Sequence, residues 1–203
     1  MSLTLLFWKH STAQSFRFGN AFQESGYQFT AAITTDPQGN AIRCGIFQGC
    51  VDFDPSPARR IINASRGPGD IFIQKSDSLG NLVWVVTLGN NSTLSAEDIC
   101  SDNSGNLFIT GTFQRTVDFN PSAAITNIRS NGSDDVFVLK LNAAGTFQNV
   151  ISFGGTSNDK PDLSFQTLQE IFSAQEALKI LATLMLHLPE HLISHLQVQK
   201  MHT

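Results

Sequence analysis

Long apolar runs, cysteine and basic clusters are all scarce in this sequence. The chain has 203 residues, three cysteines and a formal net charge of −4. No stretch reaches the roughly 20 apolar residues of a membrane-spanning helix, and no Lys/Arg cluster provides the basic face that nucleic-acid binding requires. The odd number of cysteines disfavours a disulfide framework. We therefore expect a globular domain with no membrane span, no nucleic-acid partner and no cofactor.

We expect no signal peptide at the N-terminus of this sequence. The apolar run from Leu3 to Trp8 is short, and no Lys or Arg precedes it. If the protein is exported, we expect its signal to lie outside this chain.

An internal repeat with an offset of 65 or 66 residues organises the sequence. The turn residues Asp36, Gly39 and Asn40 match Asp102, Gly105 and Asn106. The later motif residues Asp52, Phe53, Pro55, Asp70, Phe72 and Lys75 match Asp118, Phe119, Pro121, Asp135, Phe137 and Lys140. Because these positions recur once per repeat, we interpret them as structural residues of turns and of contacts between repeats.

Each copy has the pattern of strands joined by tight turns. In the segment from Asp36 to Asn40, Asp can bond its own backbone, Pro fixes φ, and Gly and Asn accept positive φ. The run from Leu82 to Leu88 is almost continuously apolar, which is typical of a buried strand. Cys44, Cys50 and Cys100 match Thr110, Thr116 and Thr34, so we expect small strand residues there rather than redox groups. Four strands per repeat form one blade of a β-propeller.

The joint pattern resembles the bacterial SBBP-type β-propeller repeat over about residues 18–158. It runs Asp-x-x-Gly-Asn, Gly-x-Phe, Asp-Phe-Asp/Asn-Pro, Asp-Ile/Val-Phe-x-x-Lys, Gly-x-x-x-Trp and Leu/Phe-Gly. The second copy departs from it, with Asn149 at the position of Trp84. The resemblance implies a propeller of about seven blades in an exported or cell-surface protein. It implies no defined catalysis and assigns no functional residues.

We divide the chain into residues 18–90 as the first repeat and 91–158 as the second. A propeller ring needs about four to eight blades, and repeat arrays generally need at least about three units. We therefore expect an incomplete propeller fragment that is marginally stable or prone to aggregate. Residues 1–17 are interpreted as the degraded or out-of-frame end of a preceding blade, and residues 159–203 as an aberrant, helix-like tail.

A shifted reading frame accounts for this tail. When the third base of each codon is joined to the first two of the next, Gln166 to Glu176 permit Asp-Ser-Ser-Gly-Asn-Ile-Phe-x-Thr-Gly, which matches Asp102 to Gly111. One position fails, because Ser173 and Ala174 cannot yield Ile or Val. Leu3 to Trp8, shifted the same way, echo Asp135 to Leu139. The tail is therefore interpreted as a frameshifted third repeat.

A histidine cluster in the tail offers an alternative. His187, His191 and His195 are spaced to share one face of a helix, and three histidines can bind zinc. However, Pro189 interrupts that helix, and the order is not His-Glu-x-x-His. A translated wrong frame explains the cluster more simply. A weak ion site at Asp52 and Asp54 is a second alternative.

These observations favour a non-catalytic scaffold or binding module, exported or at the cell surface, whose ligand is a protein or a carbohydrate. Ser56 to Pro68 and Ser122 to Ser133 are long polar segments suited to binding. Neighbouring blades are expected in the full-length protein. The alternatives are a metal-dependent enzyme that uses the histidine cluster, and the propeller appendage of an enzyme domain absent from this chain.

We predict that resequencing the DNA for residues 150–203 and its flanks finds a single-base insertion or deletion near the codons for residues 160–166. The histidine cluster would then be an artefact of the frame. An unbroken frame, with translation confirmed by peptide mass, contradicts the frameshift and makes the histidines the first place to look for metal.

Overall fold

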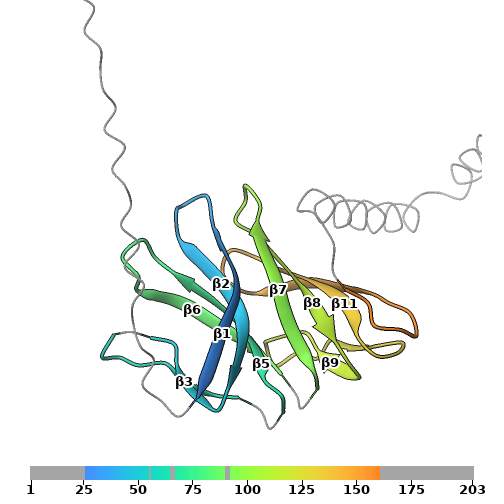
Figure 1. Ribbon diagram of the computed structural model, residues 1–203. Helices are drawn as coiled ribbons and strands as arrows, with labels where there is room; N and C mark the ends of the chain where they lie inside the picture. The colour runs from blue at the N-terminus through green and yellow to red at the C-terminus, as the bar shows by residue number, and fades with distance from the viewer. Residues whose placement is uncertain (1–25, 55, 65–66, 90–91, 161–203) are drawn as a thin grey trace, which may run out of the picture.

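The described part of the chain is built from strands alone. The computed structural model describes residues 26–54, 56–64, 67–89 and 92–160, and every regular element among them is a β-strand (Figure 1). The first antiparallel sheet holds β1 (Tyr27–Thr35), β2 (Ala41–Gln48), β5 (Asp70–Ser76) and β6 (Leu82–Leu88), in that order. The second holds β7 (Leu94–Ser101), β8 (Leu107–Phe113), β11 (Asp135–Leu141) and β12 (Phe147–Phe153). The predicted all-β class with four-stranded antiparallel repeats is confirmed.

A small hairpin is inserted between the second and third strands of each sheet. β3 (Cys50–Asp52) pairs with β4 (Ile61–Asn63), and β9 (Thr116–Asp118) pairs with β10 (Asn127–Arg129). β4 and β10 fall inside segments for which the sequence predicts only loops. Three-residue strands are too short to show a period of alternation, so the sequence gives no signal for them.

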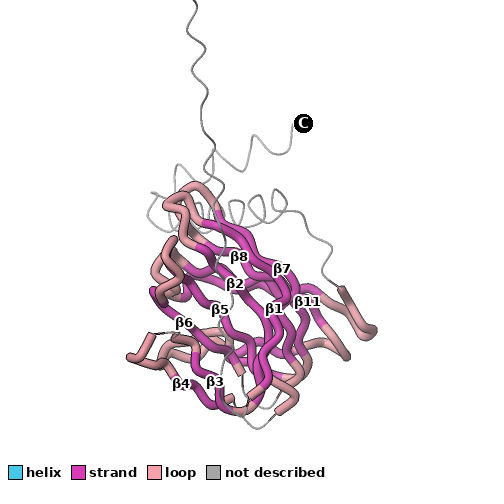
Figure 2. Tube along the Cα trace, turned by 60° about the vertical axis from the view of Figure 1, so that its left-hand side comes forward, coloured by secondary structure: helices cyan, strands magenta, loops and turns pink. Residues whose placement is uncertain are grey.

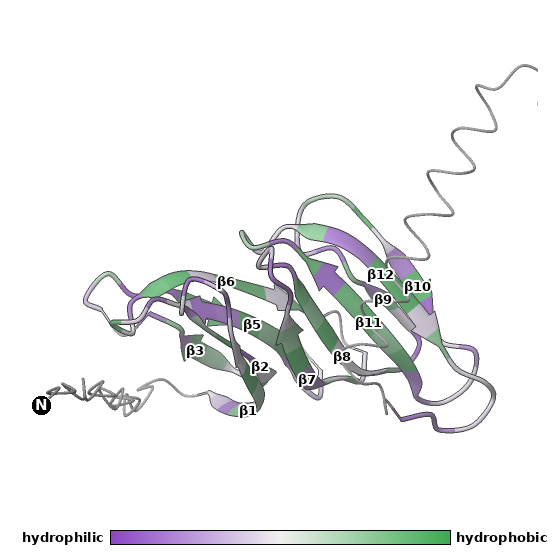
Figure 3. Cartoon of the chain, turned by 90° about the horizontal axis from the view of Figure 1, so that it is seen from above, coloured by the Kyte–Doolittle hydropathy of each residue, from purple (hydrophilic) through white to green (hydrophobic). Residues whose placement is uncertain are grey.

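The two sheets lie side by side and spread apart from their first strands, β1 and β7 (Figures 1 and 3). The described residues form no closed ring or barrel (Figure 2). This arrangement is consistent with two blades of an incomplete propeller. Among these residues no helix has the length and apolarity needed to cross a membrane. Residues 1–17 and nearly all of the predicted tail, including His187, His191 and His195, lie outside the described residues.

The main core is the contact between the sheets. Cys44 lies opposite Ile73 on one face of the first sheet, and Ile109 lies opposite Leu139 on one face of the second. These faces meet in one buried cluster that also contains Ile42, Ile71, Leu88, Leu94, Ile99, Leu107, Phe137 and Leu141. Because Cys44 matches Thr110 in the repeat, and not Ile109, the sheets meet through unlike faces. Figure 3 colours the strands of both sheets by hydropathy.

A triad of phenylalanines attaches each hairpin to its sheet. In the second repeat the ring centroid of Phe119 lies 5.2 Å from that of Phe113 and 4.9 Å from that of Phe137. Phe47, Phe53 and Phe72 repeat this arrangement in the first sheet. All six rings are fully buried. The recurring Phe in the Asp-Phe-Asp/Asn-Pro motif is therefore a core residue that holds the hairpin down.

A β-bulge in the first strand of each sheet explains the recurring Gly-x-Phe motif. The register shifts between Thr30 and Ala32 in β1, and between Ala96 and Asp98 in β7. A Cβ on Gly111 would lie 1.8 Å from the carbonyl oxygen of Ser95. Since this neighbour is backbone, only glycine fits opposite the bulge. Gly45 meets Phe29 in the same way.

We predict that Gly111→Ala destabilises the chain by roughly 1–3 kcal/mol or more, because the added methyl group overlaps backbone that cannot move independently of the sheet. Urea unfolding followed by circular dichroism measures the change. Gly155→Ala is the matched control, since a Cβ there meets nothing within 4 Å. Equal unfolding midpoints for the two variants would contradict this role for Gly111.

Candidate functional site at the joint between the sheets

Four turns that connect neighbouring strands share one hydrogen-bond pattern. In the first turn the N–H of Gly39 donates to the carbonyl of Asp36 over 2.9 Å, and the N–H of Asn40 donates to Oδ1 of Asp36 over 2.9 Å. The φ angle of Gly39 is 79°, which places it in the left-handed region. The other three turns begin at Asp77, Asp102 and Asn142 and use the same bonds. Both predicted structural turns, 36–40 and 102–106, therefore have a local physical cause.

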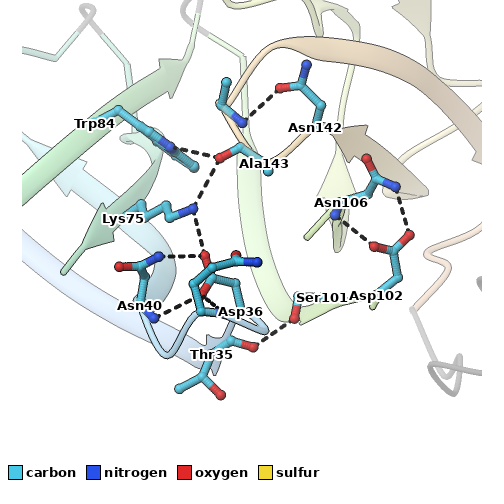
Figure 4. Close-up of polar contacts among 12 residues, drawn as sticks. Thr35, Asp36, Asn40, Lys75, Trp84, Ser101, Asp102, Asn106, Asn142 and Ala143 are labelled. Atoms are coloured by element: carbon cyan, nitrogen blue, oxygen red, sulfur yellow. Dashed lines mark hydrogen bonds and ion pairs between the residues drawn. The ribbon is translucent and has the colours of Figure 1, made fainter. Parts of the chain in front are cut away.

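The first turn also carries the principal buried charge pair of the described residues. Nζ of Lys75 lies 2.7 Å from Oδ2 of Asp36, and the two side chains are 9% and 0% exposed (Figure 4). Burial raises the pKa of Asp36, but hydrogen bonds from Asn40 and Lys75 outweigh it and hold the pKa below its ordinary value. Asp36 is therefore a carboxylate at neutral pH, committed to the turn and to Lys75.

Lys75 connects this turn to the second sheet. Its Nζ donates to the carbonyl oxygen of Ala143 over 3.3 Å, and Nε1 of Trp84 donates to the same oxygen over 3.3 Å (Figure 4). Ala143 lies in the turn between β11 and β12. Oγ of Ser101 bonds the carbonyl of Thr35 over 2.7 Å. We call this set of contacts the joint.

The repeat does not reproduce the joint in full. The Trp84 indole packs on Gly145, where a Cβ would lie 3.2 Å from the ring. Asn149 holds the position of Trp84 in the second repeat. Lys140, which matches Lys75, places its Nζ 5.7 Å from the centre of the Phe108 ring.

The recurring aspartates of the hairpins close their loops. Oδ1 of Asp118 accepts from the N–H groups of Asn120 and Thr126, over 3.0 and 2.8 Å. Oδ1 of Asp52 does the same for Asp54 and Arg60. Pro121 follows in a bend, whereas Pro55 lies outside the described residues. Oδ1 of Asp54 accepts from the N–H of Ser56 over 2.9 Å, so one oxygen of each carboxylate in the suggested ion site is bonded to the loop backbone.

Arg59 modifies the first of these loops. Its Nε lies 2.9 Å from Oδ2 of Asp52. Burial raises the pKa of Asp52, but the hydrogen bonds from Arg59 and the loop backbone lower it below the ordinary value. The Arg59 side chain is half exposed, so this pair adds little stability.

The last recurring pair, Asp70 and Asp135, lies against glycine. A Cβ on Gly154 would lie 2.2 Å from the carboxyl carbon of Asp135, and Gly89 meets Asp70 in the same way. Both aspartates are buried. The recurring Leu/Phe-Gly motif therefore leaves room for a carboxylate at the end of the sheet.

The described residues bear on two kinds of reactive site, a metal-binding cluster and a reactive cysteine. They contain no group of three or more His, Cys, Asp and Glu able to hold a metal. All three cysteines lie on strands, and none forms a disulfide. Burial raises the pKa of Cys44 to about 12 and that of Cys100 to about 12, so both are thiols at neutral pH.

The structural roles of some residues cannot be predicted from the sequence pattern. Phe47 and Phe113 match in the repeat, but only the structure shows that they complete the phenylalanine triads. Ala143, whose carbonyl accepts from both Lys75 and Trp84, lies 68 and 59 residues away from them along the chain, and no local pattern indicates this contact.

Comparison with protein-family models finds no match for this chain, and comparison with curated proteins finds none either.

We predict that Asp36→Asn destabilises the chain by roughly 3 kcal/mol at pH 7, because it leaves the buried Lys75 ammonium without its counter-charge. The turn itself should survive, since Asn142 fills the same role in the fourth turn. The pKa of Asp36 is lowered by folding, so its contribution is present above about pH 4 and is lost as the pH falls through the folded pKa. Urea unfolding of both proteins should show their difference shrinking below about pH 4.

Asp102→Asn is the control for this experiment. Asp102 accepts the same turn bonds, and no ion pair joins it to a cation of the described residues. We expect a loss below about 1 kcal/mol. Equal losses in the two variants would show that the turn matters, and the charge pair does not.

Proposed function

We propose that this chain belongs to an exported, non-catalytic β-propeller protein of the SBBP repeat type, which acts as a scaffold or binding module. The observation that carries the proposal is the use of the recurring polar residues. Asp36, Asp52, Asp118 and Lys75 are all engaged in turns, hairpin loops or the joint. These recurring polar residues thus have structural partners within a repeat or between the two repeats.

We propose that the ligand is bound by the segments whose sequences differ between the two repeats. The loops of the two hairpins have nearly the same backbone bonds: Ser56 and Ser122 accept from Ala58 and Ala124, each over 3.2 Å. The segments that follow these loops differ in sequence between the repeats. A rigid frame that carries variable segments suits recognition of a protein or carbohydrate surface. No observation on the described residues favours the enzyme alternative.

We predict that an antiserum raised against the purified chain detects its antigen on the cell surface or in the medium of the native host. Protease treatment of intact cells should remove the surface signal. A cytosolic marker protein, measured in the same samples, controls for lysis. An antigen found only inside intact cells, protected from protease, would reject export.

A further inference from the structure

A polar pocket of about 540 Å³ lies at one end of the second sheet. It forms where the chain leaves β8 for β9, and where it leaves β10 for β11. Its lining includes Gln114, Arg115, Thr116, Arg129, Ser130 and Ser133. The pocket thus offers two guanidinium groups together with hydroxyl and amide groups, and none of these lining side chains is aromatic or aliphatic.

The two arginines are placed by the hairpin. Arg129 lies opposite Thr116 in the β9–β10 ladder, and Arg115 directly precedes Thr116. The backbone of Arg115 is tied to Ser130 twice: its N–H donates to Oγ over 2.9 Å, and its carbonyl accepts from the N–H of Ser130 over 2.8 Å. Both side chains are exposed. No ion pair joins either guanidinium to a carboxylate of the described residues.

The first repeat shows that the fold does not require either arginine. Gly49 stands at the position of Arg115, and Asn63 at the position of Arg129. The backbone is left-handed at both matched positions, with φ of 70° at Gly49 and 62° at Arg115. Glycine accepts this conformation freely, whereas a side chain is strained in it. Arg115 therefore keeps its guanidinium at the pocket in spite of an unfavourable backbone.

We infer that this pocket binds an oxyanion group, a phosphate, sulfate or carboxylate carried by a hydrophilic ligand. Guanidinium groups bind such oxygens through paired N–H donors, and the hydroxyl of Ser133, which also lines the pocket, can add a neutral donor. The nearby carboxylate of Asp134 accepts from Nε2 of Gln114 over 2.8 Å, which orients the amide and offsets one positive charge. The inference deepens the proposed function, on which it rests, by naming the class of ligand.

The test is a titration of the full chain with inorganic phosphate, sulfate and malonate at constant ionic strength. It is followed by ¹H–¹⁵N NMR of the backbone around Thr116 and of the arginine Nε–H groups. We expect saturable shifts at these signals, weakened at least tenfold by Arg115→Gly and by Arg129→Asn. Each variant carries the residue of the first repeat, so the fold should persist. Arg115→Gly should unfold at an equal or higher urea concentration, because it relieves strain.

Arg60→Asn is the matched control, because it removes one positive charge from an exposed position outside the pocket. It should bind the anions as the unaltered chain does. If phosphate and sulfate bind and malonate does not, the ligand group is a tetrahedral anion. If malonate alone binds, the ligand group is a carboxylate. Absence of saturable shifts, or equal weakening in Arg60→Asn, overturns the site.

The titration and the surface-localisation experiment fail independently. A surface antigen that binds none of the three anions rejects this pocket alone. An anion-binding chain whose antigen stays inside the cell rejects export and leaves the pocket in place.

Discussion

The contact between unlike faces of the two sheets is the constraint on which the other features depend. One face of the first sheet, with Cys44 and Ile73, meets the opposite kind of face on the second, with Ile109 and Leu139. Because the faces that meet are unlike, each sheet keeps one face of the other kind outside this contact. The bulges, the phenylalanine triads and the joint all shape or align these faces. Burial of each large apolar side chain contributes about 1.5–3 kcal/mol, which makes this contact the main source of stability.

The face of the first sheet that points away from the second sheet is more polar than the corresponding face of the second sheet, which is buried between the sheets. Arg43 stands where the second repeat has Ile109, and Gln74 stands where it has Leu139. Nε of Arg43 donates to Oε1 of Gln74 over 3.0 Å, and Nε2 of Gln74 donates to the carbonyl of Phe53 over 2.9 Å. Gln74 is buried and Arg43 is partly buried, and both have partners within their own repeat. This face is therefore suited to water or to a polar neighbour, as outer faces of repeat arrays commonly are.

The features that sequence reasoning recovers are local ones. The turn from Asp36 to Asn40 is predictable because its bonds join residues at most four apart. The recurrence of Gly111 is visible in the sequence, but its cause is a carbonyl of the neighbouring strand, which only the register reveals. The joint depends on a contact between Trp84 and Ala143, which no periodicity encodes. The sequence thus predicts contacts between residues close together in the chain, but not contacts between residues far apart in it.

Comparison of the two repeats gives a physical rule for separating fold from function. Residues that match, such as Asp52 and Asp118, have the same backbone partners in both copies, so the fold alone accounts for them. Positions that differ need a separate cause. Trp84 contacts the turn of the neighbouring repeat at Ala143, and the second repeat has Asn149 at the position of Trp84. This difference is one of packing between repeats. Arg115 replaces Gly49 on a left-handed backbone, which adds strain, and no ion pair joins its guanidinium to a carboxylate of the described residues. The first repeat builds the same hairpin with glycine at this position, and this difference supports our proposal that the pocket binds an oxyanion.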